Sequence, residues 1–303
     1  KKISDYITKK VADKLSGMCK TDRENYEKYW DDISPFIKFG CIKDEKFCER
    51  MMEYVLFKDL DGKYTTMNEY LEAENPTDGD ADKVEEKTEE KTEEKADGEE
   101  KETPKTTIYY VTDEIQQSQY INMFREQKMN AVILKDNIDN PFISHLEAKN
   151  EKVKFQRIDA DVTDSMKEEV SEEELKGETD ALTALFRKAL NNDKLEVKVE
   201  KLKNEKVSSM ITLSEENRRM QEMMKMYNMY GMDPSMFGTT TTLVLNANNA
   251  LVKYLFQNPE GEHSNMICEQ LYDLAMISHQ PLNPEAMTRF VNRSNEIMML
   301  LTK

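Results

Sequence analysis

The sequence has few of the residues from which catalytic and phosphate-binding sites are usually built. Its 303 residues include only nine glycines, and no GxGxxG or GxxxxGK(S/T) pattern opens an expected helix. It also lacks an HExxH motif and a GxSxG motif. The three histidines, His145, His263 and His279, are isolated from one another, so no metal site is expected. These absences are typical of a non-catalytic chain that holds no cofactor of its own.

Long apolar runs and paired cysteines are missing as well. No apolar run reaches the roughly 18 residues that a membrane span needs, and the first residues do not resemble a signal peptide. The four cysteines, Cys19, Cys41, Cys48 and Cys268, show no CxxC spacing. Free and mostly buried thiols in a reducing compartment are the natural interpretation. We therefore expect a cytoplasmic protein without a membrane partner.

Positive charge is also in deficit. The chain has 43 lysines and arginines against 60 aspartates and glutamates, a formal net charge of -17. Such a chain repels phosphate backbones, so nucleic acid is not an expected partner. Residues 74–105 are the most acidic stretch and have almost no apolar positions, so they cannot bury enough surface to offset the entropy of ordering. We expect a charged, solvated insertion there; an interaction site is the alternative.

Residues 1–73 are expected to form helices, because apolar residues recur at steps of three and four. Thr21 with Glu24 predicts a capping box for the second helix, which Pro35 is expected to bend or break. Two later signals follow in order: a plain turn at 59–64, and a second capping pair, Thr66 with Glu69.

The rest of the chain alternates strands and helices, which predicts an α/β region followed by an α+β region. Residues 106–165 are expected to form a small α/β unit whose strands make a parallel sheet, and a second, α+β region is expected from about residue 168. The expected strands are 107–112, 131–134, 153–158, 195–200, 207–213 and 240–245. The expected helices are 114–128, 140–148, 178–191 and 248–257, followed by two terminal helices.

A methionine-rich stretch, 218–237, is the most unusual feature. Eight of the 20 methionines lie between Met210 and Met236. On a helical wheel one arc collects Met220, Met223, Met224, Met226, Tyr227 and Tyr230, and a polar side collects Arg218, Gln221, Glu222 and Lys225. Thioether side chains are flexible and polarisable, so such an arc can adapt to many partners. A core helix that happens to use methionine is the alternative.

The two terminal helices carry more apolar residues than a solvated chain end needs. The apolar positions are Ile267, Leu271, Leu274 and Ile277 in the first helix, and Met287, Phe290, Val291, Ile297, Met298 and Leu301 in the second. The second set approximates a heptad seam. Two coverings are possible: packing against the strands of the same chain, or a symmetric pairing with a second copy.

Several segments, in this order, resemble the heat-shock protein 90 family of chaperones, in particular its bacterial members. They are ITKKVADKL (7–15), NYEKYWDDISPFIKFG (25–40), IYYVTDE (108–114), AVILKDNID (131–139) and LYDLAMIS (271–278). The resemblance covers nearly the whole chain except 74–105. It implies the later, helical and αβα parts of the middle domain, then a C-terminal dimerisation domain from about residue 168.

The resemblance also implies partners and site residues. A full-length member uses ATP and Mg, but the nucleotide domain is expected to be absent here, so this chain by itself should be no enzyme. A homodimer is implied through the terminal helices. Non-native client proteins are implied to contact Met223, Met226 and Tyr227, to which the helical wheel adds Met220. A second client contact of the family uses a tryptophan where this sequence has Pro141 beside Phe142.

An alternative of another class is a small α/β nucleotide-binding protein or enzyme that uses the 106–165 sheet. Sites in such sheets lie where the strands end. Here those positions are Thr112–Glu114, Lys135–Asp136 and Asp159–Asp161. They are acidic and lack a glycine turn, which weakens this alternative.

Overall fold

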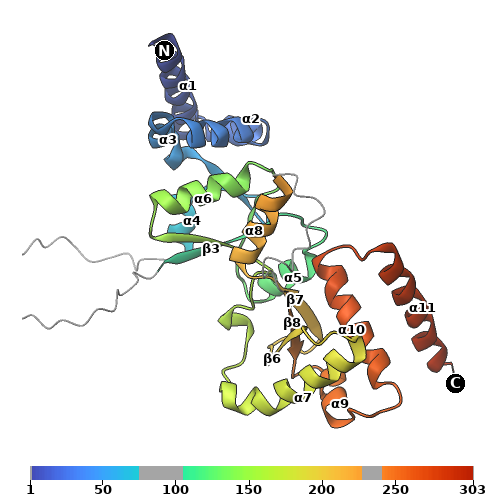
Figure 1. Cartoon of the computed structure of the whole chain (residues 1–303). Coiled ribbons are helices and arrows are strands. Elements are labelled where there is room, and N and C mark those ends of the chain that lie inside the picture. The colour runs from blue at the N-terminus through green and yellow to red at the C-terminus, as the bar shows by residue number, and fades with distance from the viewer. Residues whose placement is uncertain (1, 75–104, 227–240, 303) are drawn as a thin grey trace, which may run out of the picture. The chain divides into compact units, whose positions relative to one another are not determined.

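The computed structural model describes residues 2–74, 105–226 and 241–302 (Figure 1). The chain divides into a first unit, residues 1–108 with 136–155, and a second unit, residues 109–135 with 156–303. This division does not test the domain boundaries predicted near residues 73, 105 and 167, which stay a prediction. Apart from its two end residues, the predicted insertion at 74–105 lies outside the described residues. No described helix is both long and apolar enough to cross a membrane.

The first unit begins with the helices that the apolar periodicity predicts: α1 (Lys2–Thr21), α2 (Arg23–Lys43), α3 (Glu45–Met51) and the short η1 (Met52–Tyr54). Two details differ from the prediction. Pro35 does not break α2, which continues past it. Thr21 does not cap α2, because its hydroxyl donates 2.9 Å to the Gly17 carbonyl at the end of α1. Asp22 precedes α2 without a side-chain cap.

Residues 55–66 form a β-hairpin where we predicted a helix end and a plain turn. β1 (Leu56–Asp59) pairs antiparallel with β2 (Tyr64–Thr66). The Asp59 carboxylate accepts the Asp61 and Lys63 amides at 2.9 and 2.8 Å, and Gly62 takes the left-handed φ of 82° that closes the turn.

The capping pair predicted at Thr66 and Glu69 is confirmed at the start of α4 (Met67–Glu74). The Glu69 carboxylate accepts the Thr66 amide at 2.7 Å, and the Thr66 hydroxyl accepts the Glu69 amide at 3.2 Å. Each side chain thus satisfies a backbone donor that the first helical turn leaves unpaired.

The predicted strand–helix alternation is confirmed in the αβα region. Its elements are β3 (Thr106–Val111), α5 (Ser118–Glu126), β4 (Val132–Ile133), α6 (Asp139–Lys149) and β5 (Val153–Arg157). β3 and β4 are parallel, as expected for a strand–helix–strand crossover. The sheet order is β2-β1-β4-β3-β5, so the hairpin that we missed makes the sheet mixed and not purely parallel.

The second unit contains a three-stranded sheet of order β6-β8-β7. Its strands are β6 (Glu196–Glu200), β7 (Ser209–Thr212) and β8 (Thr242–Asn246); β8 is parallel to β6 and antiparallel to β7. The helices are α7 (Glu172–Leu190), α8 (Glu215–Met226), α9 (Ala250–Gln257), α10 (Ser264–His279) and α11 (Pro284–Leu300), with the short η2 (Asp164–Met166) ahead of them.

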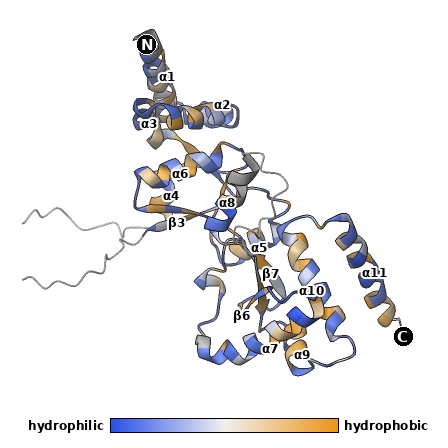
Figure 2. Ribbon diagram, viewed as in Figure 1, coloured by the Kyte–Doolittle hydropathy of each residue, from blue (hydrophilic) through white to orange (hydrophobic). Residues whose placement is uncertain are grey.

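One apolar core joins this sheet to α7, α9 and α10. It includes Phe186, Leu243, Leu255 and Leu271, all 1% exposed or less. Apolar stretches of α9 and α10 appear in orange in Figure 2. The free thiol of Cys268 is buried in the same core, and burial raises its pKa to about 12. The prediction of free, buried cysteines is confirmed for all four.

Within the first unit, a buried ion pair holds α6 on α2. Lys38 Nζ lies 2.5 Å from Asp139 Oδ1, and both side chains are almost fully buried. The other carboxylate oxygen of Asp139 accepts the Asp136 amide at 2.9 Å. Because buried charges are costly when unpaired, each partner depends on the other.

We therefore expect Lys38→Ala to lower the free energy of unfolding by about 3–5 kcal/mol, because it leaves the Asp139 carboxylate buried without its cation. Urea unfolding followed by tryptophan fluorescence of Trp30 would measure this. Replacing both partners (Lys38→Met with Asp139→Leu) should recover more than half of the loss, and Lys46→Ala, at an exposed position, should change little. A double variant as unstable as Lys38→Ala would contradict the assignment.

Candidate functional site

The predicted methionine-rich helix is α8, and the structure describes its backbone to Met226. Ser214 caps this helix, since its hydroxyl accepts the Asn217 amide at 3.3 Å. Met220 is half-buried. Met223 and Met226 lie on the described backbone of α8, but their side chains, and the whole of Tyr227, are outside the described residues.

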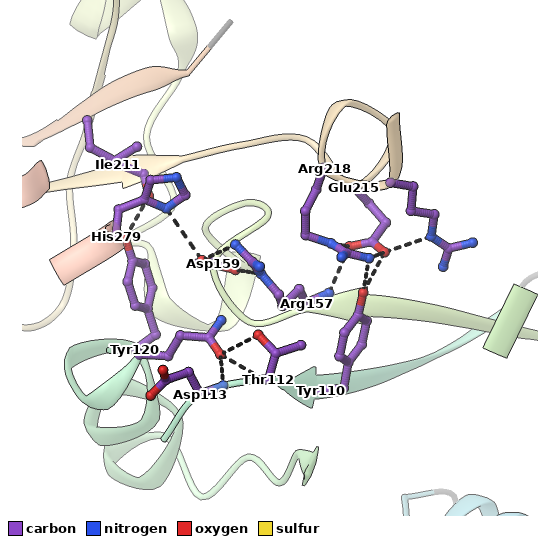
Figure 3. A network of polar contacts seen from close by, with 12 residues as sticks. Tyr110, Thr112, Asp113, Tyr120, Arg157, Asp159, Ile211, Glu215, Arg218 and His279 are labelled. Atoms are coloured by element: carbon purple, nitrogen blue, oxygen red, sulfur yellow. Dashed lines mark hydrogen bonds and ion pairs between the residues drawn. The ribbon is translucent and has the colours of Figure 1, made fainter. Parts of the chain in front are cut away.

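The first turn of α8 is fixed by a buried arginine. We placed Arg218 on the polar side of the helix, yet its side chain is 2% exposed. Its guanidinium donates to the Glu215 carboxylate at 2.6 Å and to the Tyr110 hydroxyl, and it lies 5.3 Å from the centre of the Tyr110 ring (Figure 3). A buried arginine needs such planar, paired contacts because its charge cannot be neutralised.

Glu215 links this arginine to the neighbouring strands. Its carboxylate accepts the Tyr110 hydroxyl at 2.8 Å, the Arg157 amide at 3.0 Å and the Arg219 guanidinium at 2.8 Å. Burial raises the pKa of Glu215, but hydrogen bonding and the charge of Arg218 outweigh burial and hold the pKa at about 2. Burial and the Glu215 charge raise the pKa of Tyr110, so its hydroxyl stays a donor.

A second buried polar cluster lies beside the first in Figure 3. Arg157 donates to both oxygens of Asp159 at 2.5 and 2.7 Å, and His279 Nδ1, at the end of α10, lies 3.5 Å from Asp159. Burial raises the pKa of Asp159, but His279 and Arg157 together lower it below its ordinary range. The Tyr120 hydroxyl donates to the Ile211 carbonyl at 2.6 Å. These contacts join α10, β7 and the αβα region within the second unit.

Two of the three strand ends considered for a nucleotide are engaged by side chains of the chain itself. The buried Gln117 side chain accepts the amides of Thr112 and Asp113 at 2.8 and 3.1 Å, at the end of β3. Asp159 is engaged by Arg157 and His279. Over the described ranges, no cluster of three or more His, Cys, Asp or Glu residues is placed to hold a metal ion. The local geometry therefore gives no support to the α/β enzyme alternative.

The two terminal helices are joined by a second buried arginine. Arg293 of α11 donates to Gln270 and Glu269 of α10, both at 2.9 Å, and pairs with Asp273. Its side chain is 9% exposed. Arg293 thus attaches α11 to α10 through polar contacts, on the side of α11 where Phe290 and Ile297 are half-buried.

The apolar positions predicted for this end separate into three groups. Leu271 is buried in the core of its own chain, which removes it from any outer surface. Ile267, Ile277, Phe290 and Ile297 are half-buried. The exposed group is Leu274, Met287, Val291, Met298 and Leu301, of which Met298 is 56% and Leu301 84% exposed.

Sequence reasoning missed the two arginine anchors. Glu215 and Arg218 stand three residues apart in a first helical turn, a spacing that allows a local pair. Nothing local indicated Tyr110, which is 108 residues away from Arg218. The contacts of Arg293 could not be predicted from local sequence either, because its partners lie at least 20 residues upstream on another helix.

Comparison with known proteins adds family information to this geometry. The model of the family described as "Hsp90 protein" matches residues 1–80 and 99–302. The chain is 34% identical over 272 residues to the chaperone protein HtpG of Bacteroides thetaiotaomicron, covering 86% of this chain and 36% of that protein. It is 32% identical over 262 residues to HtpG of Porphyromonas gingivalis, covering 83% and 34%. The chain therefore spans about a third of the length of these relatives.

The low pKa of Glu215 generates a pH-dependent prediction. Its folded pKa, about 2, lies below its ordinary value of 4.5, so its stabilising effect is present above pH 4.5 and is lost as the pH falls toward 2. Glu215→Gln should lower the free energy of unfolding at pH 7 by about 2–3 kcal/mol and flatten its fall between pH 4.5 and 2. Urea unfolding at a series of pH values measures both effects.

Glu216→Gln is the matched control, because Glu216 is the exposed neighbour in the same helical turn. It should leave both the stability and its pH dependence close to those of the unmodified chain. Equal behaviour of the two glutamine variants would show that Glu215 is not the group held ionised by Arg218.

Proposed function

Because this chain belongs to the Hsp90 protein family, we propose that it is the client-binding and dimerising part of a molecular chaperone. The observation that carries the client-binding proposal is the burial of Arg218, which commits one side of α8 to the protein interior. In a regular helix, position 220 lies about 160° and position 223 about 140° around the axis from position 218. These methionine positions therefore belong to the side of α8 opposite the anchor.

The proposed client surface consists of Met220, Met223, Met226 and Tyr227. Position 226 lies only about 80° from position 218, at the border of the surface. Flexible thioethers can follow the shape of many apolar partners, and each side chain can contribute about 1–3 kcal/mol when fully buried against one. Several adaptable contacts suit a chaperone that binds many non-native chains better than one tight pocket does.

The same proposal does not extend to the αβα region. Phe142, beside Pro141, is fully buried in α6. It is not available as an exposed aromatic contact in place of the tryptophan that other family members have there.

For assembly, we propose a homodimer formed through the exposed apolar residues of α10 and α11. Leu274, Met287, Val291, Met298 and Leu301 line this surface, with Ile267, Ile277, Phe290 and Ile297 partly buried beside them. Because Arg293 already attaches α11 to α10, these residues remain available to a second copy. A symmetric pair covers both copies of such a surface at once.

We propose that the whole protein uses ATP and Mg; this chain spans about a third of the length of its relatives. The nucleotide is proposed to bind outside residues 1–303, while residues 1–303 contribute the client and dimer contacts. The protein is proposed to act in the cytoplasm.

Adding charge to the methionine side of α8 should weaken client binding. Met223→Glu with Met226→Glu is expected to reduce suppression of aggregation of a heat-denatured test protein several-fold, because carboxylates disfavour apolar contact. Light scattering measures the suppression. Gln221→Glu with Lys225→Gln makes the same change in net charge at positions about 60° and about 20° from position 218, on the anchored side of α8, and should leave suppression nearly unchanged. Equal loss in both variants, or loss in neither, would remove this surface from the proposal.

Charge on α11 should separate the dimer. Val291→Glu with Met298→Glu is expected to raise the dimer dissociation constant by at least about 100-fold, because two carboxylates per copy would be buried in the contact. Sedimentation equilibrium gives the solution mass. The control, Thr288→Glu with Asn292→Glu, adds the same charge to other exposed positions of α11 and should remain dimeric. An unmodified chain that stays monomeric at tens of micromolar would disprove the assembly.

A further inference from the structure

In the second unit, the outer edge of β6 is paired with neighbouring backbone over only part of its length. β6 is an outer strand, so only one of its edges pairs with β8. The Glu200 carbonyl accepts the Ala247 amide on the β8 side at 2.9 Å. Because backbone groups alternate along a strand, those of Val197 and Val199 point to the opposite edge.

A short stretch of chain begins to pair with this edge and then leaves it. Lys167 and Leu202 form an antiparallel bridge, in which the Glu168 amide donates 2.8 Å to the Lys201 carbonyl. The chain then turns into α7, which Ser171 caps. Among the residues that the structure describes, no hydrogen bond reaches the edge-facing backbone of Val197 or Val199. The ladder that the 166–168 segment starts is therefore open along β6.

An open groove lies beside the unpaired edge. Its volume is about 860 Å³, and it runs between residues 164–170, the first half of α7 and β6. Its apolar lining consists of Val170, Leu175 and Val199. Side chains opposite Val199 on an added strand would share its face of the sheet and meet this lining.

The same groove is acidic. Six carboxylates line it against three lysines, and Lys167 and Lys198 are both engaged by Glu200, at 3.2 and 2.7 Å. The exposed carboxylates are Asp164, Glu168, Glu169, Glu173 and Asp180. Their field favours a cationic occupant and disfavours a second copy of a chain whose net charge is -17.

We propose that β6 binds an extended, basic segment of another polypeptide as an added strand. The backbone of that segment would hydrogen-bond to Val197 and Val199, continuing the ladder past Lys201. Alternate residues would be apolar, against Val170 and Leu175, and lysine or arginine, toward the exposed carboxylates. This surface is separate from the methionine side of α8 and from α11, and it does not rest on the function proposed for either.

The probe is a short fluorescent peptide of alternating lysine and valine, titrated into the full chain and followed by anisotropy. Two matched peptides test the chemistry: one with glutamate in place of lysine, and one with proline in place of every valine. Both should bind at least about tenfold more weakly, because the first is repelled and the second cannot add as a strand. Added salt should weaken the lysine peptide.

Amide hydrogen exchange locates the site without any substitution. The lysine peptide should slow exchange of the Val197 and Val199 amides. Val197→Pro removes an edge-facing donor while sparing the bonds to β8, and should weaken binding by about tenfold or more. Glu168→Lys with Glu173→Lys should weaken it about tenfold, whereas Asp193→Lys with Glu262→Lys, at exposed positions elsewhere, should change it less than about twofold.

Three results would overturn the proposal. They are unchanged exchange at Val197 and Val199, equal binding of the glutamate peptide, and a chain dimer that Val197→Pro abolishes, which would make a second copy the occupant. Met223→Glu with Met226→Glu should leave peptide binding unchanged. Failure of the β6 proposal is thereby distinguishable from failure of the client-binding proposal.

Discussion

The contact of Arg218 with Glu215 and Tyr110 decides how α8 is used. A guanidinium cannot lose its charge at any pH that a folded protein meets, so its burial requires a fixed carboxylate and a fixed hydroxyl. Those partners come from the helix itself and from β3. Rotating α8 about its axis would carry Glu215 along with Arg218, but it would break the contacts of both residues with Tyr110 and that of Glu215 with the Arg157 amide. Polar contacts therefore fix the orientation of the first turn of the helix.

The same arrangement recurs at the chain's far end. Arg293 is the buried residue of α11, with Phe290 and Ile297 half-buried on its side, and residues such as Val291 and Met298 are exposed. An ordinary surface helix keeps its charges in solvent and its apolar stripe toward the core. In both α8 and α11 an arginine instead takes an inner position. This shared feature links the proposed client surface with the proposed dimer surface.

The β6 edge offers a different kind of contact. Here the available groups belong to the backbone, and the side chains around them supply charge in place of apolar area. Methionine contacts are tolerant of partner sequence, whereas an added strand requires an extended backbone and, in an acidic groove, basic residues. The two surfaces that we propose in the second unit therefore differ in the partners that they would select.

The sequence by itself determined most helices and strands, because the spacing of apolar residues is a local property. The Thr66–Glu69 cap could be predicted for the same reason, since its partners are three residues apart. The hairpin at 55–66 was missed because its strands are short and its apolar run, Val55 to Phe57, has no alternation. Only the tertiary structure decided that Arg218, Arg293 and Leu271 are buried and that β6 keeps an open edge. Each of these depends on residues far away in the chain, and a periodic pattern shows which side of a helix is apolar without showing which side is covered.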